Sequence, residues 1–275
     1  MRLKLVALAA ALALAATACG GGAGGGSNVL TDATQNTYDA GTAKIDMTIL
    51  TTGARTLKIQ GAGVMDFADR QGRLTLQIPS PQATGAAQVQ TLYDGFVIYM
   101  KSPFFRQLLP NAKPWIKLDI KKLESSSELS FTQISQLNQS DPTEFLGYLR
   151  GATTVKKTGS EDVRGVKTTH YSARIDLSQA AEQAPDNIQK EFKAAVDRIK
   201  QTTGSDTLPV DVWVDGQGRV AKELVKLGDS SGGATITMEL FDYGVDVNVK
   251  TPAASQTTDL LELLGRRVAS PSPTG

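Results

Sequence analysis

Apolar and polar residues alternate along much of the chain between residues 45 and 241. Ile45, Met47 and Ile49, for example, are separated by Asp46 and Thr48. Alternation of this kind gives a strand one apolar and one polar face, as in a sheet that packs one side on a core. The pattern predicts strands at residues 45–49, 57–67, 74–78, 89–93, 96–100, 115–120, 153–158, 166–175, 208–214, 220–227 and 234–241.

Turn residues separate many of these predicted strands and indicate antiparallel hairpins. Asp94-Gly95, between two apolar runs, is a strong signal for a two-residue hairpin turn. Longer connections that contain glycine occur at residues 69–72, 162–165 and 215–218. Consecutive strands are therefore expected to pair with each other in antiparallel order.

Four segments have helical patterns instead. The clearest runs from Pro185 to Gln201, where apolar residues recur every three or four positions and form one stripe. Asp141 is a candidate N-cap for a helix that begins at Pro142. Weaker patterns predict helices at residues 28–40 and 258–266.

A majority of strands, with helices at the start, middle and end, indicates an α+β fold built on one large antiparallel sheet. A sheet of about ten strands has to curl or close on itself. Gly61 and Gly63 lie inside a predicted strand, on the same face as Met65 and Phe67, where glycine permits a sharp bend or the close approach of another group. We expect a strongly curved sheet, a half-barrel, whose apolar concave face is covered by helices.

The N-terminal region, residues 1–18, has the layout of a lipoprotein signal peptide. Arg2 and Lys4 precede an apolar stretch that is shorter than the roughly 20 residues a membrane-spanning helix needs. Small residues then lead into Cys19, the only cysteine, in a sequence similar to a bacterial lipobox, although Ala16 stands where leucine is favoured. The alternative is an ordinary secretory signal followed by a chance cysteine. Lipidation of Cys19 would hold the protein on the extracytoplasmic face of the cell membrane.

The rest of the chain divides into three parts. Residues 19–27 comprise the lipidated cysteine and a glycine-rich tether with a reach of about 15 Å. Residues 28–266 suit a single domain, and residues 267–275 form a Pro/Ser-rich tail that is expected to be disordered. Once Cys19 is modified, no thiol is left for a disulfide, so the domain has to be stabilised by its core.

Charge and residue content argue against several classes of function. The formal net charge is +1 with acidic and basic residues interspersed, which argues against a nucleic-acid-binding protein. His170 is the only histidine and is expected to be a solvated strand residue, so zinc sites and nucleophile–histidine pairs have few candidates. Glu161, Asp162 and Arg164 are expected in a charged turn. We therefore expect a protein without metal or cofactor that is not an enzyme.

Four segments resemble the LppX/LprG-type lipoproteins of mycobacteria and their relatives. They are the first predicted helix leading into TAKIDMTI, LYDGFVIYMKSPF followed by PWIKLDI, LPVDVWVDGQGRVAKELVKL, and ATITMELFDYGVDVNVKTP, which ends in an Asp-Tyr-Gly turn and a final short strand. The resemblance covers residues 28–252. It implies a half-barrel similar to that of the lipoprotein carrier LolA, with an apolar cavity that holds the acyl chains of a lipid or glycolipid. The chain departs from the family pattern at residues 121–150 and in its C-terminal segment.

A lipid site needs a concave apolar wall and a mouth but no reactive group. The candidate wall consists of alternating apolar residues in the first three predicted strands, where methionine side chains would adapt to variable chains. These residues are Ile45, Met47, Ile49, Leu57, Ile59, Met65, Phe67, Leu74, Leu76 and Ile78. The alternative is that the same residues pack a closed core under the helices.

A segment bounded by prolines, residues 102–114, carries much apolar surface for a loop. It suits a lid over the cavity mouth, or an edge that touches the membrane with its basic residues facing anionic headgroups. The alternative is a loop that is tucked into the core. The apolar residues are Phe104, Phe105, Leu108 and Leu109, and the basic ones are Lys101, Arg106 and Lys113.

Two functions are compatible with these expectations. The first is a monomeric lipid-binding carrier or chaperone, anchored to the membrane by its own lipid, with a lipid or glycolipid as its ligand. The second is an interaction or sensing module of the cell envelope that uses the same fold to bind another envelope protein and carries no lipid. A large apolar cavity favours the first function, and a filled core with an exposed apolar patch favours the second.

Overall fold

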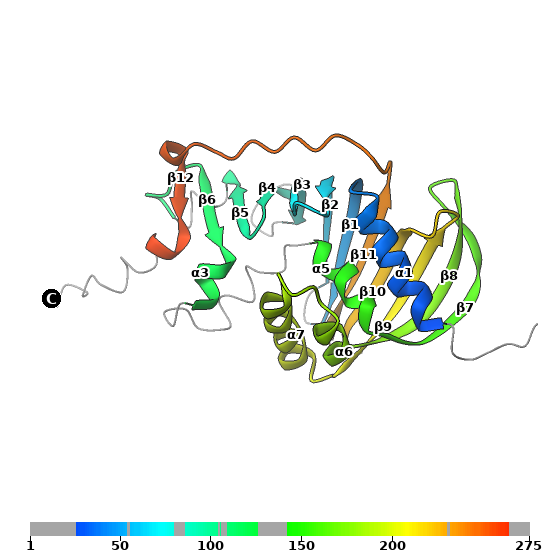
Figure 1. Ribbon diagram of the computed structural model, residues 1–275. Coiled ribbons are helices and arrows are strands. Elements are labelled where there is room, and N and C mark those ends of the chain that lie inside the picture. The colour runs from blue at the N-terminus through cyan, green and yellow to red at the C-terminus, as the bar shows by residue number, and fades with distance from the viewer. Residues whose placement is uncertain are drawn as a thin grey trace, which may run out of the picture.

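The computed structural model describes residues 26–53, 56–79, 86–103, 105, 109–125, 142–229 and 232–263. Within these residues, twelve strands form one sheet in the order β12-β6-β5-β4-β3-β2-β1-β11-β10-β9-β8-β7 (Figure 1). The strands are β1 (Thr42–Thr52), β2 (Leu57–Asp66), β3 (Gln71–Pro79), β4 (Ala86–Asp94), β5 (Val97–Lys101), β6 (Trp115–Asp119), β7 (Ala152–Val163), β8 (Val166–Asp176), β9 (Thr207–Asp215), β10 (Val220–Asp229), β11 (Gly232–Phe241) and β12 (Thr257–Asp259). The predicted α+β class with one large, curved sheet is confirmed, and all its pairings except that of β12 with β6 are antiparallel.

The sheet consists of two meanders that join along one seam. Strands β1–β6 pair in sequence order, and so do β7–β11. Most neighbours are joined by short connections, but residues 102–114 link β5 to β6 and residues 177–206 link β8 to β9. The seam is the antiparallel pairing of β1 with β11, which extends from Lys44 opposite Phe241 to Thr52 opposite Gly233. The predicted turn at Asp94-Gly95 is present, with Gly95 in the left-handed region at φ 60°.

The helices pack mainly on one side of the second meander (Figure 1). They are α1 (Gly26–Asp39), α3 (Ile120–Ser125), α5 (Pro142–Tyr148), α6 (Leu177–Glu182) and α7 (Gln189–Thr203), with short 3-10 turns η1 (Leu149–Gly151) and η2 (Ala254–Gln256). The hydroxyl of Thr37 in α1 accepts a hydrogen bond of 2.9 Å from the backbone N–H of Val220 in β10. The Tyr148 and Phe192 rings, 4.9 Å apart between centroids, join α5 to α7.

The helix predicted from Pro185 to Gln201 is present as α7, but it begins only at Gln189 and ends at Thr203. The short helix α6 ends before this range, at Glu182, and was not predicted. The carboxylate of Asp176 caps α6 by accepting hydrogen bonds from the backbone N–H groups of Ser178 and Gln179. Pro185 disfavours helical backbone at the residue before it, which separates the two helices.

The predicted C-terminal helix at residues 258–266 was also wrong at its start. Residues 257–259 form β12, which pairs parallel with β6 at the edge of the sheet. This pairing makes the sheet mixed rather than fully antiparallel. A helical turn begins only at Leu260, and residues beyond 263 lie outside the described part of the chain.

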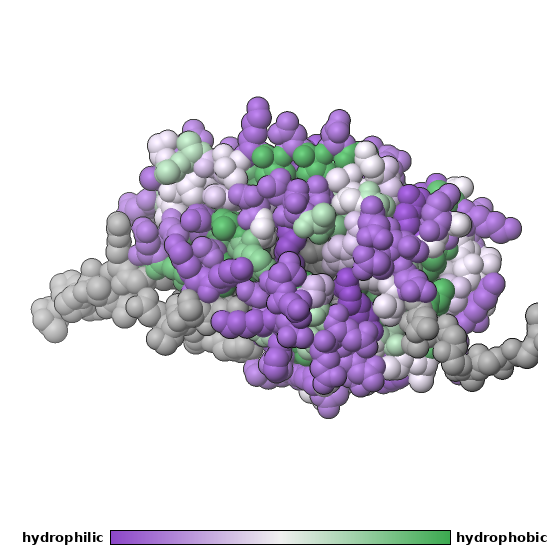
Figure 2. Space-filling view, viewed as in Figure 1, coloured by the Kyte–Doolittle hydropathy of each residue, from purple (hydrophilic) through white to green (hydrophobic). Residues whose placement is uncertain are grey.

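An extended segment, residues 245–253, links β11 to the C-terminal elements, and we call it the strap. The sequence predicted a short strand here, but the strap has no partner strand in the described residues. It crosses one end of the first meander, where Figure 2 shows hydrophobic surface (Figures 1 and 2). Val245, Val247 and Val249 are half-buried, whereas the polar residues between them are exposed. The hydroxyl of Thr42 donates a hydrogen bond of 2.6 Å to the Val245 carbonyl and fixes the start of the strap.

Glycines in β2 allow the close approach that the sequence predicted. A Cβ atom on Gly63 would collide with the carbonyl oxygen of Arg73 and would lie 2.9 Å from Leu74 Cα. At Gly61 the nearest atom would be Cδ2 of Leu76, the end of a flexible side chain, at 2.7 Å. The backbone of β3 therefore presses on β2 at Gly63, where a side chain cannot be accommodated.

Candidate functional site: the inner face of the sheet

The side of the sheet that carries Ile45 also packs on the helices, and we call it the inner face. Cross-strand pairing places Met47 of β1 opposite Gly61 of β2, and Gly61 opposite Leu76 of β3. The structure brings nine predicted wall residues onto this face, namely Ile45, Met47, Ile49, Leu57, Ile59, Met65, Leu74, Leu76 and Ile78. Phe67 lies in the turn after β2, where its ring makes an edge contact with Tyr38 at 6.0 Å between centroids.

Burial changes from one end of the inner face to the other. Ile45 and Met65 are fully buried, and Leu74 and Phe67 are 2% exposed. At the opposite end, near the β1–β2 hairpin, the predicted wall residues Ile49, Leu57, Ile59, Leu76 and Ile78 are only half-buried. We call this end the open end. The closed end is a packed core, as the alternative interpretation predicted, but the open end leaves apolar side chains within reach of solvent.

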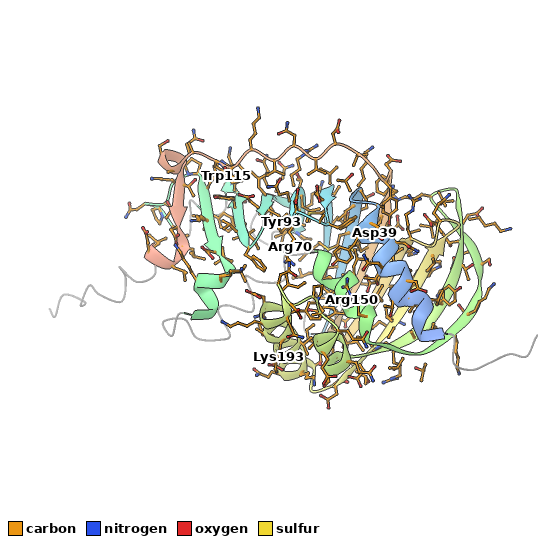
Figure 3. The ribbon with its side chains drawn as sticks, viewed as in Figure 1. Asp39, Arg70, Tyr93, Trp115, Arg150 and Lys193 are labelled. Carbon is orange, nitrogen blue, oxygen red and sulfur yellow. The ribbon has the colours of Figure 1, made fainter. Side chains whose placement is uncertain are left out.

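The inner face extends beyond the three strands that the sequence prediction included. Tyr93 of β4 lies in the middle of the molecule and is buried (Figure 3). Further inner-face residues are Val89, Ile98, Met100, Ile116, Leu118, Val210, Val212, Val225, Ile236 and Met238. The alternation in these strands was visible in the sequence, but it does not show which distant strands share a surface.

One acidic residue, Glu223 of β10, interrupts the apolar inner face. It is 1% exposed, and its cross-strand neighbours are Val212 of β9 and Met238 of β11. Neither carboxyl oxygen of Glu223 has a hydrogen-bond partner among the described residues. Burial raises the pKa of Glu223 from 4.5 to about 8, because the charged form loses its hydration. The carboxyl group is therefore protonated and neutral at pH 7.

The apolar loop after β5 contributes two described residues to this region. Phe105 and Leu109 are half-buried and pack against the core of the sheet. A backbone hydrogen bond of 2.8 Å from Leu109 N–H to the Phe105 carbonyl holds the two residues one helical turn apart. Phe104, Leu108 and Arg106 lie outside the described residues, as does Cys19.

His170 is half-buried rather than solvated as predicted. Its ring stacks on the indole of Trp213 with centroids 4.2 Å apart, on the outer face of the sheet. Its Nε2 atom lies 3.1 Å from Asp211 Oδ1, and its Nδ1 atom lies 3.5 Å from Glu161 Oε1. The indole N–H of Trp213 donates to the same Glu161 carboxylate. These contacts tie β7, β8 and β9 together.

The predicted charged turn also has a structural role. Glu161 and Asp162 belong to β7, and the turn itself is formed by Arg164, with φ 52°, and Gly165. The Arg164 guanidinium pairs with Asp46 of β1 and with Glu239 of β11, and it stacks on the Phe241 ring at 3.9 Å. The tip of the β7–β8 hairpin is thereby held against the outer face near the seam.

Two grooves in the described residues are lined mostly by polar and charged residues. The first, of about 450 Å³, lies on the outer face and is lined by threonine and glutamine side chains together with Arg164. The second, of about 600 Å³, lies between α6 and α7 and is lined by three lysines. Lys193, which projects from α7 (Figure 3), pairs with Asp197 at 2.9 Å, and Lys200 pairs with Asp206 at 3.0 Å. These ion pairs reduce the attraction of the second groove for anions.

The His, Cys, Asp and Glu side chains of the described residues include no group of three that could hold a metal ion. No helix that the structure describes combines the length and apolar character needed to cross a membrane. The inner face is therefore the candidate site that the described residues support best.

Comparison with known proteins gives the chain its family. No protein-family model matches it. Over 254 residues it is 30% identical to an uncharacterised 31.2 kDa protein from the rplA–rplJ intergenic region of Streptomyces griseus, covering 89% of this chain and 82% of that protein. The chain belongs to the family of that Streptomyces protein. It is also 24% identical over 250 residues to a candidate lipoprotein of Streptomyces coelicolor, SCO4650, with 86% of this chain and 76% of that protein covered.

The structure also aligns with solved mycobacterial lipoproteins at low similarity. The crystal structure of LppX from Mycobacterium tuberculosis aligns with a TM-score of 0.45 and 16% sequence identity, covering 81% of this chain and 98% of that one. The open, curved sheet with helices on its inner face is the architecture that the sequence resemblance to LppX/LprG-type lipoproteins implied.

Proposed function

We propose that the protein is a lipid-anchored extracytoplasmic lipoprotein that binds a lipid or glycolipid on the inner face of its sheet. The observation that carries this proposal is the graded burial of the face, whose apolar side chains continue from a packed core to the half-buried open end. Acyl chains can extend such a core without any reactive group. We further propose that the tethered domain works as a monomer and transfers its ligand, without catalysing a reaction.

A tryptophan at the open end should reduce the amount of lipid bound. Ile59 is half-buried on the inner face of β2, whereas its neighbour Lys58 is exposed on the other face. Ile59→Trp would displace one or two methylene groups of a bound chain, each worth about 0.8 kcal/mol, which corresponds to a roughly four- to fifteenfold loss of affinity. The measurement is titration of the purified protein with a fluorescent acyl-chain probe.

Lys58→Trp is the matched control, because it adds the same side chain to the same strand on the opposite face. It should bind the probe as the unmodified protein does. Equal binding by both variants would show that the inner face is not the lipid site. Ile59 is a better test position than Met65, because Met65 is fully buried and its Sδ lies where a Cβ on Gly72 would stand, so a larger side chain there would disturb folding.

Replacement of Cys19 by alanine should release the protein from the membrane. The anchor is proposed from the sequence around Cys19, and similarity to a candidate lipoprotein supports it. Because no other acylation site remains, the Cys19→Ala variant should be recovered in the soluble fraction of cells, whereas the unmodified protein stays with the membrane. Intact-mass spectrometry of the N-terminus provides the second measurement. An anchored Cys19→Ala variant would contradict this part of the proposal.

The molecules that co-purify with the protein distinguish the first function from the second, a module that binds another envelope protein. Protein extracted from its native membrane should yield an amphiphile by mass spectrometry if it carries lipid. Absence of any amphiphile, together with stoichiometric recovery of one envelope protein, would favour the interaction module instead.

A further inference from the structure

Among the described residues, Asp215 and Glu223 both carry a deeply buried carboxyl group, but the hydrogen bonding of their oxygens differs. Asp215, which is 8% exposed, accepts hydrogen bonds from the backbone N–H groups of Gln217 and Arg219 and from the Arg219 guanidinium. Glu223 is buried more deeply, at 1% exposed, and both of its oxygens lack a partner in the described part of the chain. A buried polar group without a hydrogen bond is costly, so it requires a structural or functional explanation.

In the neighbouring described strands, no charged residue lies opposite Glu223. Its cross-strand neighbours on the inner face are Val212 and Met238, and Met47 lies beyond Met238 across the seam. Burial is the sole cause of its raised pKa, so no ionisable neighbour contributes. A neutral carboxyl group offers one O–H donor together with acceptor oxygens. A hydroxyl group, which also donates and accepts, is therefore the simplest complement.

The position of Glu223 defines how deep that hydroxyl group would lie. Along β10, the inner-face residues run from half-buried Leu227 at the open end through buried Val225 to Glu223. Four residues of strand separate Glu223 from Leu227, which corresponds to about 13 Å. A ligand that enters at the open end would meet Glu223 with the middle of an acyl chain rather than with a headgroup held at the rim.

We propose that Glu223 recognises a hydroxyl group carried on the acyl chain of the bound lipid. This inference rests on the proposed function, because it specifies the class of lipid that the inner face binds. The carboxyl O–H donates to the lipid hydroxyl, or the carboxyl C=O oxygen accepts from it, while Met238, Met47 and Val212 contact the flanking methylene groups. A chain without the hydroxyl leaves the carboxyl group unpaired, and the site therefore selects against it.

Two fatty acids that differ by a single hydroxyl group test the proposal. The full-length mature protein is titrated at pH 7 with 12-hydroxyoctadecanoic acid and with octadecanoic acid, each in competition with a fluorescent acyl-chain probe. The unmodified protein should bind the hydroxylated acid about tenfold more tightly, as one net hydrogen bond allows. Glu223→Leu should abolish that preference, and Glu223→Gln, which keeps a neutral hydrogen-bonding group, should retain part of it.

Glu182→Leu serves as the control, because Glu182 is an exposed carboxylate on α6 and its removal should leave the preference unchanged. Equal affinities of the unmodified protein for the two acids would overturn the role of Glu223 and leave lipid binding intact. Failure to bind either acid or the probe would overturn the proposed function itself. Circular dichroism identifies any variant that does not fold, and Glu223→Gln then decides the question, because it preserves the size of the side chain.

Discussion

Replacement of Gly63 by alanine is expected to lower the free energy of unfolding by about 3 kcal/mol, which is the range of severe steric substitutions in a core. The added Cβ would occupy the position of the Arg73 carbonyl oxygen and would crowd the backbone at Leu74. Backbone atoms cannot rotate out of the way, so β2 and β3 would have to separate where Gly63 pairs with Leu74. Thermal unfolding followed by circular dichroism should show a fall in melting temperature of roughly 6–12 °C.

Gly61→Ala is the matched control in the same strand. Its Cβ would meet only Cδ2 of Leu76, which can change rotamer, so we expect a loss of less than about 1 kcal/mol. Both variants replace a glycine of β2 by alanine. They differ only in the atoms of β3 that the added Cβ would meet. Similar melting temperatures for both would show that β3 does not approach β2 as closely as described.

The stability of the protein should fall as the pH rises from about 5 to about 8, and Glu223 should account for the fall. Its pKa is raised from 4.5 to about 8 in the folded state, so between these values the folded state binds one more proton than the unfolded state. Linkage then requires unfolding to become easier with rising pH, by roughly 1 kcal/mol per pH unit. The stabilisation is complete below the unfolded pKa and is lost as the pH approaches the folded pKa.

Urea unfolding at several pH values compares the protein with its Glu223→Gln variant. The variant cannot ionise, so the difference in unfolding free energy between the two should change steadily across this interval and level off above about pH 8. A constant difference would mean that Glu223 is hydrated or paired in the folded state. Glu223→Leu should be more stable than the unmodified protein at pH 8, because an apolar group replaces an unpaired buried carboxyl group.

Much of the sheet could be predicted from the sequence because its strands are specified locally. Alternation gave the positions of β1–β11, and Asp94-Gly95 gave the β4–β5 turn. The strand β12 was missed because residues 257–259 carry no alternation of their own, and their conformation comes from pairing with β6. The apolar residues that follow, Leu260 and Leu261, gave the segment a pattern that is typical of an amphipathic helix.

The candidate site was predictable on β1–β3 but not on β10. A register irregularity lies between Val220 and Lys222 where β10 pairs with β9. A bulge of one residue moves every following side chain to the opposite face of the sheet. Glu223 therefore lies on the inner face and Leu224 on the outer face. The alternation of apolar and polar residues in the sequence could not predict this assignment. The start of α6, in contrast, had a visible signal in Asp176, because aspartate is a typical N-cap residue.

The seam between β1 and β11 also determines the order in which the protein can fold. Every other antiparallel pairing in the described sheet joins strands that are consecutive in sequence, so these pairs can form before the rest of the domain is available. Strand β1 can pair with β11, and β6 with β12, only when nearly the whole domain is available. Such long-range closure gives a high contact order and slow folding, during which unpaired strand edges are exposed to neighbouring chains.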